Sequence, residues 1–531
     1  MLGIQKKKQS PIYWFLLLII VVSGFLIRVI DIEQDALSGD EVSLGLAAKG
    51  VIKHGYPIIE DFHSEIKRPS TTSELVSYLI APSLLILGER PLAIRMHSVI
   101  TGTLSIVMLF ILALKLFNVR TAFFAATIYT FSPQCITCAQ WARYPSTLML
   151  LAMLTIYFFW HYMVETDGPS QRKYIIATAV CYLACFFSWQ GSGFFLLALF
   201  VANIVYKGKD FSWLKDRFLL STGFILFVTM YFVLLRRSLI TSPIMVLGMG
   251  TQNVSLKPLW SYPTFDLLYY VDNFLLTTSF WFVSVPAFFS LIWLNKDKAI
   301  AVLWTVLTVT ILMMTFFLET RGFRYAYYLF PCIVILGSYV VSTVFDYFIK
   351  CANNLAPHVR SLAWMTKTGA LIIVIIFLIL PTSLILELES LYGKNMTSGN
   401  ELSRYRLGSN TSVIKYFKEH YRPGDKIISF VPHQDYFYLG KVPDFFIESL
   451  LQFPVIISGD KERAVHRISW TELIYTLEDF KKIQAENRRI WFIGPSILGS
   501  LLLKDDDSLF RKSKMKQVAE DINFDLYLWE N

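Results

Sequence analysis

The chain has little charge for its length. Charged residues make up 17% of its 531 positions, whereas ordinary soluble domains contain about a quarter. Hydrophobic residues make up 54%. This balance excludes a typical soluble globular protein and leaves a chain with enough apolar sequence to reside in a membrane.

Cysteine is also scarce, and each of the six residues precedes position 352. Cys135 and Cys138 have the spacing of half a zinc site, but no second pair completes it, so we interpret the two thiols as packing residues. The formal net charge is +9. No basic stripe with interleaved aromatic residues accompanies that charge, so nucleic acid is not a predicted partner.

Long apolar runs are abundant. Each can cross a hydrocarbon core of about 30 Å as a helix. The stretch 174–206 is too long for one span and is interrupted by WQGSG at 189–193, which predicts two spans joined by a tight turn. With these two, we predict eleven spans, the others being 12–30, 96–114, 122–142, 145–162, 218–235, 273–294, 299–318, 325–345 and 368–386. With the N-terminus inside, Lys and Arg concentrate in the inner loops, as the positive-inside rule requires.

These spans predict an α-helical polytopic membrane domain over 1–388, and a small C-terminal α/β domain over 389–531. A long first outer loop, 31–95, contains an apolar segment at 75–87 that we expect to be an interfacial helix. In the C-terminal domain, strand patterns separated by helical patterns indicate α/β structure. The expected elements are a helix near 412–420, a strand at 426–431, a helix near 471–484 and a strand at 489–493. An odd number of spans places this domain outside the cytoplasm.

The first outer loop begins with Ser38-Gly39-Asp40-Glu41, which precedes a short amphipathic pattern. A carboxylate there can act as a general base toward an incoming hydroxyl or amine. The alternative is that the two acids are solvated loop residues or a helix cap. A divalent cation is a further alternative, because hard cations prefer carboxylate oxygens. Two adjacent acids do not define a metal site, so no cofactor is predicted.

Basic residues at the predicted outer membrane edge suit a phosphate, because the guanidinium fork donates two parallel hydrogen bonds. The alternative is contact with lipid headgroups. The predicted phosphate-binding residues are Lys67, Arg68, Arg321, Arg324 and Tyr325. We expect a second polar set to line the same cavity or contact the acceptor, namely Asp61, His63, Arg143, Tyr144 and Gln190.

Several segments then occur in a familiar order. SGDE is followed by ERPLAIRMHSVITGTLSIVMLFILALKLF, then TAFFAATIYTFSPQCITCAQWARYPSTLMLLAML, later RGFRYAYYLFPCIVIL, and DYFYLGK in the C-terminal domain. This order resembles the membrane-embedded C-class (GT-C) glycosyltransferases, which use polyprenyl-phosphate sugars. Within that class it is similar to glycosyltransferase family 39 and to the group of protein O-mannosyltransferases and lipid A aminoarabinose transferase.

The resemblance implies inverting transfer of a hexose or pentose from a polyprenyl-phosphate donor to a lipid, glycan or protein acceptor. It places this reaction at the outer face of the cell membrane. Asp40 matches the catalytic acid of the family, and Glu41 matches the acid often beside it. Arg143-Tyr144 matches a polar turn facing the cavity, and Arg321 with Arg324-Tyr325 matches the phosphate-side motif.

One position departs from the family. Many relatives carry a basic residue or His followed by two prolines where this chain has Arg68-Pro69-Ser70. Lys67 is therefore an alternative to Arg68 as the phosphate ligand. A transporter or flippase of lipid-linked sugars is the main alternative function, although it has no need of a base in the first outer loop. A receptor whose working part is the C-terminal domain is another alternative.

Overall fold

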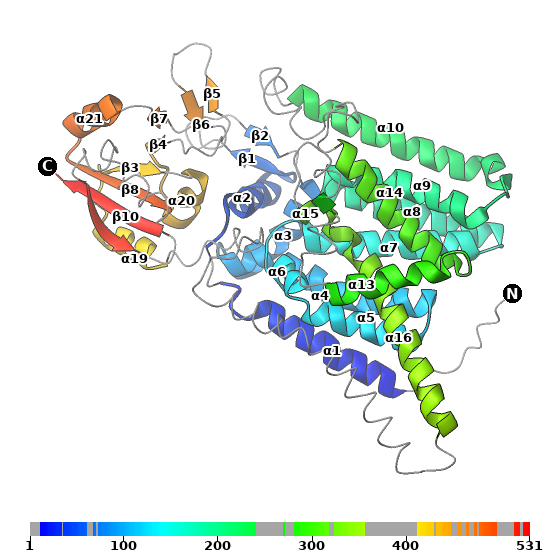
Figure 1. Cartoon of the computed structure of the whole chain (residues 1–531). Coiled ribbons are helices and arrows are strands. Elements are labelled where there is room, and N and C mark those ends of the chain that lie inside the picture. The colour runs from blue at the N-terminus through cyan, green and yellow to red at the C-terminus, as the bar shows by residue number, and fades with distance from the viewer. Residues whose placement is uncertain are drawn as a thin grey trace. The chain divides into compact units, whose positions relative to one another are not determined.

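The structure is a computed structural model (Figure 1). It describes residues 11–33, 36–60, 67–70, 73–240, 269–270, 281–317, 323–355, 411–429, 432–447, 455–457, 464–466, 472–474, 477–495, 515–520 and 524–530. The chain forms two compact units. We call Met1–Ile30 with His97–Ser398 the membrane unit, and Asp31–Met96 with Gly399–Asn531 the α/β unit. The first loop therefore groups with the C-terminal region.

The membrane unit is helical. Among the described residues, seven helical stretches are long and apolar enough to cross a membrane. This finding agrees with the predicted polytopic, multi-pass membrane protein. The helices are α1 (Pro11–Val29), α4 (Pro91–Leu116, which begins in the α/β unit), α5 (Val119–Phe131), α6 (Pro133–Ala139), α7 (Tyr144–Val164), α8 (Gly168–Ser188), α9 (Phe194–Lys207), α10 (Arg217–Ile240), α13 (Trp281–Phe289), α14 (Lys298–Phe317), α15 (Phe323–Ala326) and α16 (Phe330–Leu355). Short 3-10 turns are η1 (Gln190–Gly193), η2 (Ser212–Lys215), η6 (Ser290–Trp293) and η7 (Tyr327–Leu329).

The structure confirms that 174–206 forms two helices, because α8 and α9 meet at η1. The predicted span 122–142 is instead divided into α5 and α6 at Ser132-Pro133. Proline lacks an N–H and cannot continue the hydrogen bonding of the preceding helix. The predicted span 368–386 lies outside the described residues, so the total of eleven spans stays a prediction.

A buried arginine stabilises this helix break. The Arg28 side chain is fully buried, and its two terminal nitrogens donate to the carbonyls of Gly24 at 2.9 Å, Thr130 at 3.3 Å and Tyr129 at 3.3 Å. The Tyr129 carbonyl would ordinarily accept from the residue four positions later, which is Pro133 and has no donor. Arg28 thus supplies the donor that proline removes. The buried charge of Arg28 therefore has a structural role, because it donates to backbone carbonyls at the helix break.

The first-loop part of the α/β unit contains α2 (Gly39–His54), the two-stranded sheet of β1 (Ile58–Glu60) and β2 (Lys67–Pro69), and α3 (Glu74–Leu87). The helices expected after SGDE and at 75–87 are confirmed as helices. Gly50 lets α2 approach β1, because a Cβ at this position would lie 2.1 Å from the carbonyl oxygen of Ile58.

The C-terminal part is an eight-stranded mixed sheet in the order β5-β6-β7-β4-β3-β8-β10-β9. Its central strands β7, β4, β3 and β8 run parallel, and the strands outside them pair antiparallel. The elements are α19 (Thr411–His420), β3 (Lys426–Ser429), α20 (Pro432–Leu439), β4 (Phe445–Ile447), β5 (Val455–Ile457), β6 (Ala464–His466), β7 (Glu472–Ile474), α21 (Leu477–Glu486), β8 (Arg489–Pro495), β9 (Lys516–Glu520) and β10 (Phe524–Glu530).

Both faces of this sheet are covered, which explains the continuous apolar runs of its central strands. Successive residues of a strand point to opposite faces, so Ile427 and Trp491 pack in one core while Ile428 and Phe492 pack in the other. The predicted small α/β domain is confirmed as a fold. The helix expected near 471–484 begins later, because Glu472–Ile474 pairs with β4 as a parallel strand and the helix starts at Leu477.

Candidate functional site

The SGDE segment forms the beginning of α2. Ser38 is the N-cap, and its Oγ accepts a hydrogen bond of 3.4 Å from the Glu41 amide. Glu41 reciprocates, since its Oε2 accepts from the Ser38 amide at 2.8 Å. This is a capping box, and the Ser-x-x-Glu spacing is its sequence signature. Asp40 lies between the two residues and is exposed.

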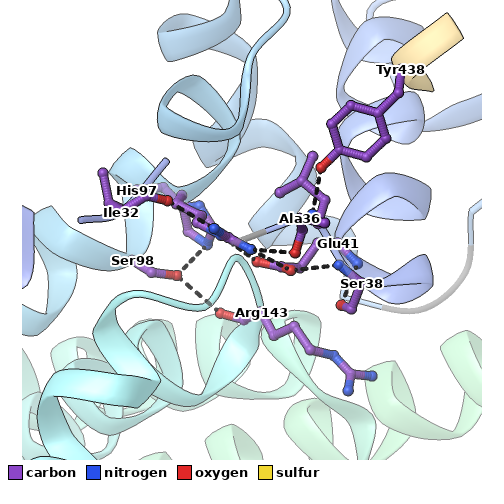
Figure 2. A network of polar contacts seen from close by, with 10 residues as sticks. Ile32, Ala36, Ser38, Glu41, His97, Ser98, Arg143 and Tyr438 are labelled. Atoms are coloured by element: carbon purple, nitrogen blue, oxygen red, sulfur yellow. Dashed lines mark hydrogen bonds and ion pairs between the residues drawn. The ribbon is translucent and has the colours of Figure 1, made fainter. Parts of the chain in front are cut away.

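Glu41 is fully buried and pairs with Arg95 of α4 (Figure 2). Arg95 Nε donates to Glu41 Oε1 at 2.9 Å, and its Nη2 donates to Oε2 at 3.0 Å. The same guanidinium donates to the carbonyls of Ile32 at 2.7 Å and Ala36 at 3.0 Å. Two of these charge-assisted hydrogen bonds fix the first turn of α2, and the other two fix the chain just before it. The two adjacent acids have different environments, because Glu41 is held inside while Asp40 faces outward.

The hydrogen bonds of Glu41 affect the alternative that a divalent cation binds the two adjacent acids. Both oxygens of Glu41 accept hydrogen bonds from Arg95 or from the Ser38 amide. A divalent ion that used Glu41 and Asp40 together would have to displace this guanidinium. Among the residues that the structure describes, no group of three His, Cys, Asp or Glu side chains has the arrangement of a metal site.

The structure describes the other candidate site residues of the first loop only in part. Lys67 and Arg68 lie in β2, where their backbones pair with Glu60 and Ile59, but their side chains are outside the described set. Asp61, His63 and Arg321 are also outside the described residues. Glu60 contacts Lys53 at 2.9 Å and His54 at 2.8 Å. These contacts lower the pKa of Glu60, with the Lys53 hydrogen bond as the largest cause.

A stack of three aromatic rings lies in the membrane unit. The ring of Trp189 is 5.4 Å from the ring of Tyr144 and 5.2 Å from that of Tyr325, with interplanar angles of 6° and 15°. We call Tyr144, Trp189 and Tyr325 the aromatic stack. Its members come from the beginning of α7, the turn after α8, and α15. The structure thus brings together three polar turns that are far apart in the sequence.

Two arginines adjoin this stack. The Arg143 guanidinium lies 4.7 Å from the Trp141 ring and 5.9 Å from the Tyr144 ring. The Arg324 guanidinium lies 5.0 Å from the Tyr325 ring and donates to the Tyr325 hydroxyl at 3.1 Å. Cation–π contact holds each guanidinium against a ring face. The stack therefore connects two cationic groups that the sequence predicts separately.

The turn that contains Gln190 positions Trp189. The indole folds back over Gly191, and a Cβ at that glycine would lie 2.2 Å from Trp189 Cζ2. Any side chain at position 191 would displace the indole. Gln190 is half-buried at the first position of η1, next to Trp189.

The carbonyl of Arg143 accepts a hydrogen bond from Ser98 Oγ at 3.4 Å, and Ser98 Oγ is 3.0 Å from a ring nitrogen of His97 (Figure 2). This contact connects the turn before α7 to α4. Ser98 is a fully buried polar residue of the apolar helix α4, so the hydrogen bond satisfies a hydroxyl group that lipid could not.

Arg95 and Trp189 are not among the site residues predicted from the sequence. Arg95 has a signal, because a charged residue inside an apolar stretch needs a partner. Ser38-x-x-Glu41 also has a signal, because it is the capping-box pattern. Trp189 has only a weak one, since tryptophan is common at membrane interfaces.

Comparison with known proteins identifies the fold. Residues 72–236 match the family model described as dolichyl-phosphate-mannose-protein mannosyltransferase. Over 98% of both chains, the structure is similar to that of ArnT from Cupriavidus metallidurans bound to undecaprenyl phosphate, with a TM-score of 0.62 and 12% sequence identity. The chain has the GT-C glycosyltransferase fold. The resemblance and the fold class predicted from the sequence are thereby confirmed.

A second GT-C structure is also similar. The archaeal oligosaccharyltransferase AglB from Archaeoglobus fulgidus, in complex with an inhibitory peptide and a dolichol-phosphate, has a TM-score of 0.54 and 12% identity over 96% of this chain and 73% of its own. No curated protein matches the chain. The range matched by the family model includes Arg95, Arg143, Tyr144 and Gln190, whereas Asp40 and Arg324 lie outside it.

Proposed function

We propose that this GT-C chain is a glycosyltransferase that moves a sugar from a polyprenyl-phosphate donor to a lipid, glycan or protein acceptor. The fold and the family match support the proposal. ArnT and AglB were solved with undecaprenyl phosphate and dolichol-phosphate, respectively, which supports the donor class. The donated sugar is a hexose or a pentose. We place the reaction on the extracytoplasmic side of the cell membrane.

The observation that supports the mechanism is that two adjacent acids have different environments. Asp40 is exposed at the beginning of α2, whereas Glu41 is buried and paired with Arg95. We assign Asp40 as the general base and Glu41 as the residue that positions it. Asp40 takes the proton of the acceptor hydroxyl or amine. The acceptor atom then bonds to the anomeric carbon while the bond from that carbon to the phosphate oxygen breaks, giving inversion.

The leaving group is already an anionic phosphate ester, so it needs cations rather than a strong acid. We assign Arg324, supported by Tyr325, to the donor phosphate, together with Arg321 and with Lys67 or Arg68. The proximity of Arg324 to the aromatic stack supports this role, because the Tyr325 hydroxyl and ring restrain its guanidinium. Asp61, His63, Arg143, Tyr144 and Gln190 are assigned to the cavity and the acceptor.

The decisive experiment reconstitutes the full chain in proteoliposomes with a radiolabelled polyprenyl-phosphate sugar, beginning with the mannose and arabinose donors. Transfer to acceptor membranes and slow donor hydrolysis are both measured. We expect Asp40→Asn to bind donor normally but to lose about 10²–10⁴-fold in turnover. Glu33→Gln is the matched control, since Glu33 is an exposed acid of the same loop that pairs with Arg90 at 3.6 Å. Turnover of Asp40→Asn within about twofold of wild type would exclude Asp40 as the base.

The same assay separates this function from its alternative. A flippase would move the labelled lipid across the bilayer and leave the sugar bound to it. Movement without transfer or hydrolysis, for every donor tried, would favour the transporter.

The phosphate assignment has its own test. Arg324→Ala should weaken donor binding more than acceptor use, and Arg324→Lys should restore part of it, because lysine retains the charge but lacks the guanidinium fork. If Arg324→Ala kept the normal dependence on donor concentration, Arg324 would not bind the phosphate.

The location of the C-terminal region can be tested separately. Residues 389–531 contain no native cysteine. Lys418 is exposed on α19, so Lys418→Cys offers a single reporter. The proposal requires that a membrane-impermeant maleimide labels it in intact cells. Labelling only after permeabilisation would place this region in the cytoplasm.

A further inference from the structure

The first loop contributes to the core of the C-terminal sheet. Ala36 is 3% exposed and belongs to the hydrophobic cluster of Phe417, Ile427, Trp491 and other residues on one face of the sheet. Both parts belong to the α/β unit. The residue that enters this core lies two positions before the N-cap of α2 and four before Asp40.

The next residue is held by a hydrogen bond. The amide of Leu37 donates to the hydroxyl of Tyr438, which lies in α20, and Leu37 itself is fully buried (Figure 2). The Tyr438 ring packs against the cluster that includes Ala36. The chain that leads into α2 thus contacts the C-terminal region through the Ala36 side chain in the core and through the backbone hydrogen bond of Leu37.

The helix that carries Tyr438 is itself anchored. α20 has eight residues, which is too short to be stable without tertiary contacts. Its Asp435 is buried, and the Ser429 hydroxyl at the end of β3 donates to the Asp435 carboxyl group. Tyr438 follows Asp435 by about one helical turn. Its hydroxyl is therefore positioned by the central strand of the sheet.

Two anchors meet at the segment before Asp40. Arg95 holds the carbonyls of Ile32 and Ala36, and Tyr438 holds the amide of Leu37. The capping box continues directly from Ser38. The two anchors therefore fix the backbone from which Asp40 projects.

We propose that Tyr438 is a positioning residue, through which the C-terminal region fixes the start of α2 and thereby aims the Asp40 carboxylate. This inference rests on the proposed function, because it presumes that Asp40 is the base. It assigns the C-terminal region a part in the chemical step in addition to any part in choosing the acceptor. A displacement of about 1 Å at a reacting group can lower a rate by about 10²-fold, so a single hydrogen bond at this point has kinetic consequences.

The test is a double-mutant cycle in the reconstituted full chain. Tyr438→Phe retains the ring and removes only the hydroxyl. We expect kcat to fall by about 5- to 50-fold, with little change in the KM for the polyprenyl-phosphate donor. In the Asp40→Asn background, Tyr438→Phe should have no further effect, because the group that it positions is no longer a base.

A merely structural role predicts a different pattern. If Tyr438 only helped the domain to fold, its replacement would lower the active fraction by the same factor in both backgrounds. Tyr421→Phe is the matched control, since Tyr421 borders the same core and contacts Phe417 and Lys441. It should leave kcat unchanged.

Hydrogen exchange of the same proteins gives a readout that needs no substrate. In Tyr438→Phe, exchange should accelerate in peptides over 36–44 and stay unchanged in β8, which is the core strand. Unchanged exchange over 36–44, an unchanged kcat, or equal losses in the two backgrounds would overturn the inference. The Asp40→Asn single variant tests the proposed base separately, so the two failures are distinguishable.

Discussion

Replacement of Arg95 by methionine is expected to destabilise the α/β unit more than any surface substitution. Arg95 and Glu41 have side chains that are only 6% and 0% exposed, and two hydrogen bonds of 2.9 and 3.0 Å join them. Without the guanidinium, Glu41 is a buried acid whose charge has lost its partner. Breaking a buried pair in this way typically costs about 3–5 kcal/mol.

The structure also indicates which hydrogen bonds contribute to this loss of stability. Two backbone carbonyls, of Ile32 and Ala36, lose charged donors at 2.7 and 3.0 Å, and each such bond is worth about 1.5–3 kcal/mol. These terms do not add fully, because Glu41 can take up a proton and water can enter. The double variant Glu41→Gln/Arg95→Met removes both charges, and should recover part of the loss of Arg95→Met alone. Arg95→Lys should be intermediate, because three donors replace five.

The assay is pulse proteolysis of the full-length protein in detergent across a urea titration. The matched control is Arg90→Met, since Arg90 is about half exposed and pairs with Glu33 at 3.6 Å, an interaction worth at most about 1 kcal/mol. The reasoning would be refuted if Arg95→Met cost less than about 1 kcal/mol, or if the double variant were less stable than Arg95→Met.

Three further predictions concern other parts of the chain. Gly191→Ala should displace Trp189 from the aromatic stack and raise the donor KM, whereas Gly168→Ala, which has nothing within 4 Å of its Cβ position, should not. Arg28→Met should lower the yield of folded protein in membranes, as measured by size-exclusion chromatography, because it removes three hydrogen bonds to backbone carbonyls. Burial raises the pKa of Asp435 from 3.8 to about 7. The folded state therefore binds a proton that the unfolded state releases, so this contribution to stability is present below about pH 4 and is lost as the pH rises through about 7. Asp435→Asn should remove that dependence from pulse-proteolysis midpoints measured between pH 5 and 8.

Much of the architecture is visible in the sequence because its signals are local. Apolar runs predict membrane helices whatever their neighbours are, and the break at 189–193 predicts two helices from one long run. The short apolar patterns at 426–431 and 489–493 predict strands, which the structure places next to each other within the sheet as β3 and β8. The prediction of helices and strands from the sequence fails where a contact with another part of the chain determines the local structure. Glu472–Ile474 is a strand because β4 lies beside it, and the run 122–142 is two helices because Pro133 removes a donor that Arg28 replaces.

The sequence by itself determined that two adjacent acids begin a helix in the first loop, because Ser38-x-x-Glu41 is a capping pattern that needs only neighbouring residues. It could not determine which acid is buried. Successive residues on a helix point about 100° apart, so the two acids face different directions and only tertiary packing decides which of them is covered. Arg95, 54 positions away, decides that Glu41 is the inner one. Long-range packing likewise placed Ala36 in the C-terminal core and Trp189 between two tyrosines. Each of these contacts joins segments that are far apart in the sequence, and no local sequence pattern indicates which distant segments meet.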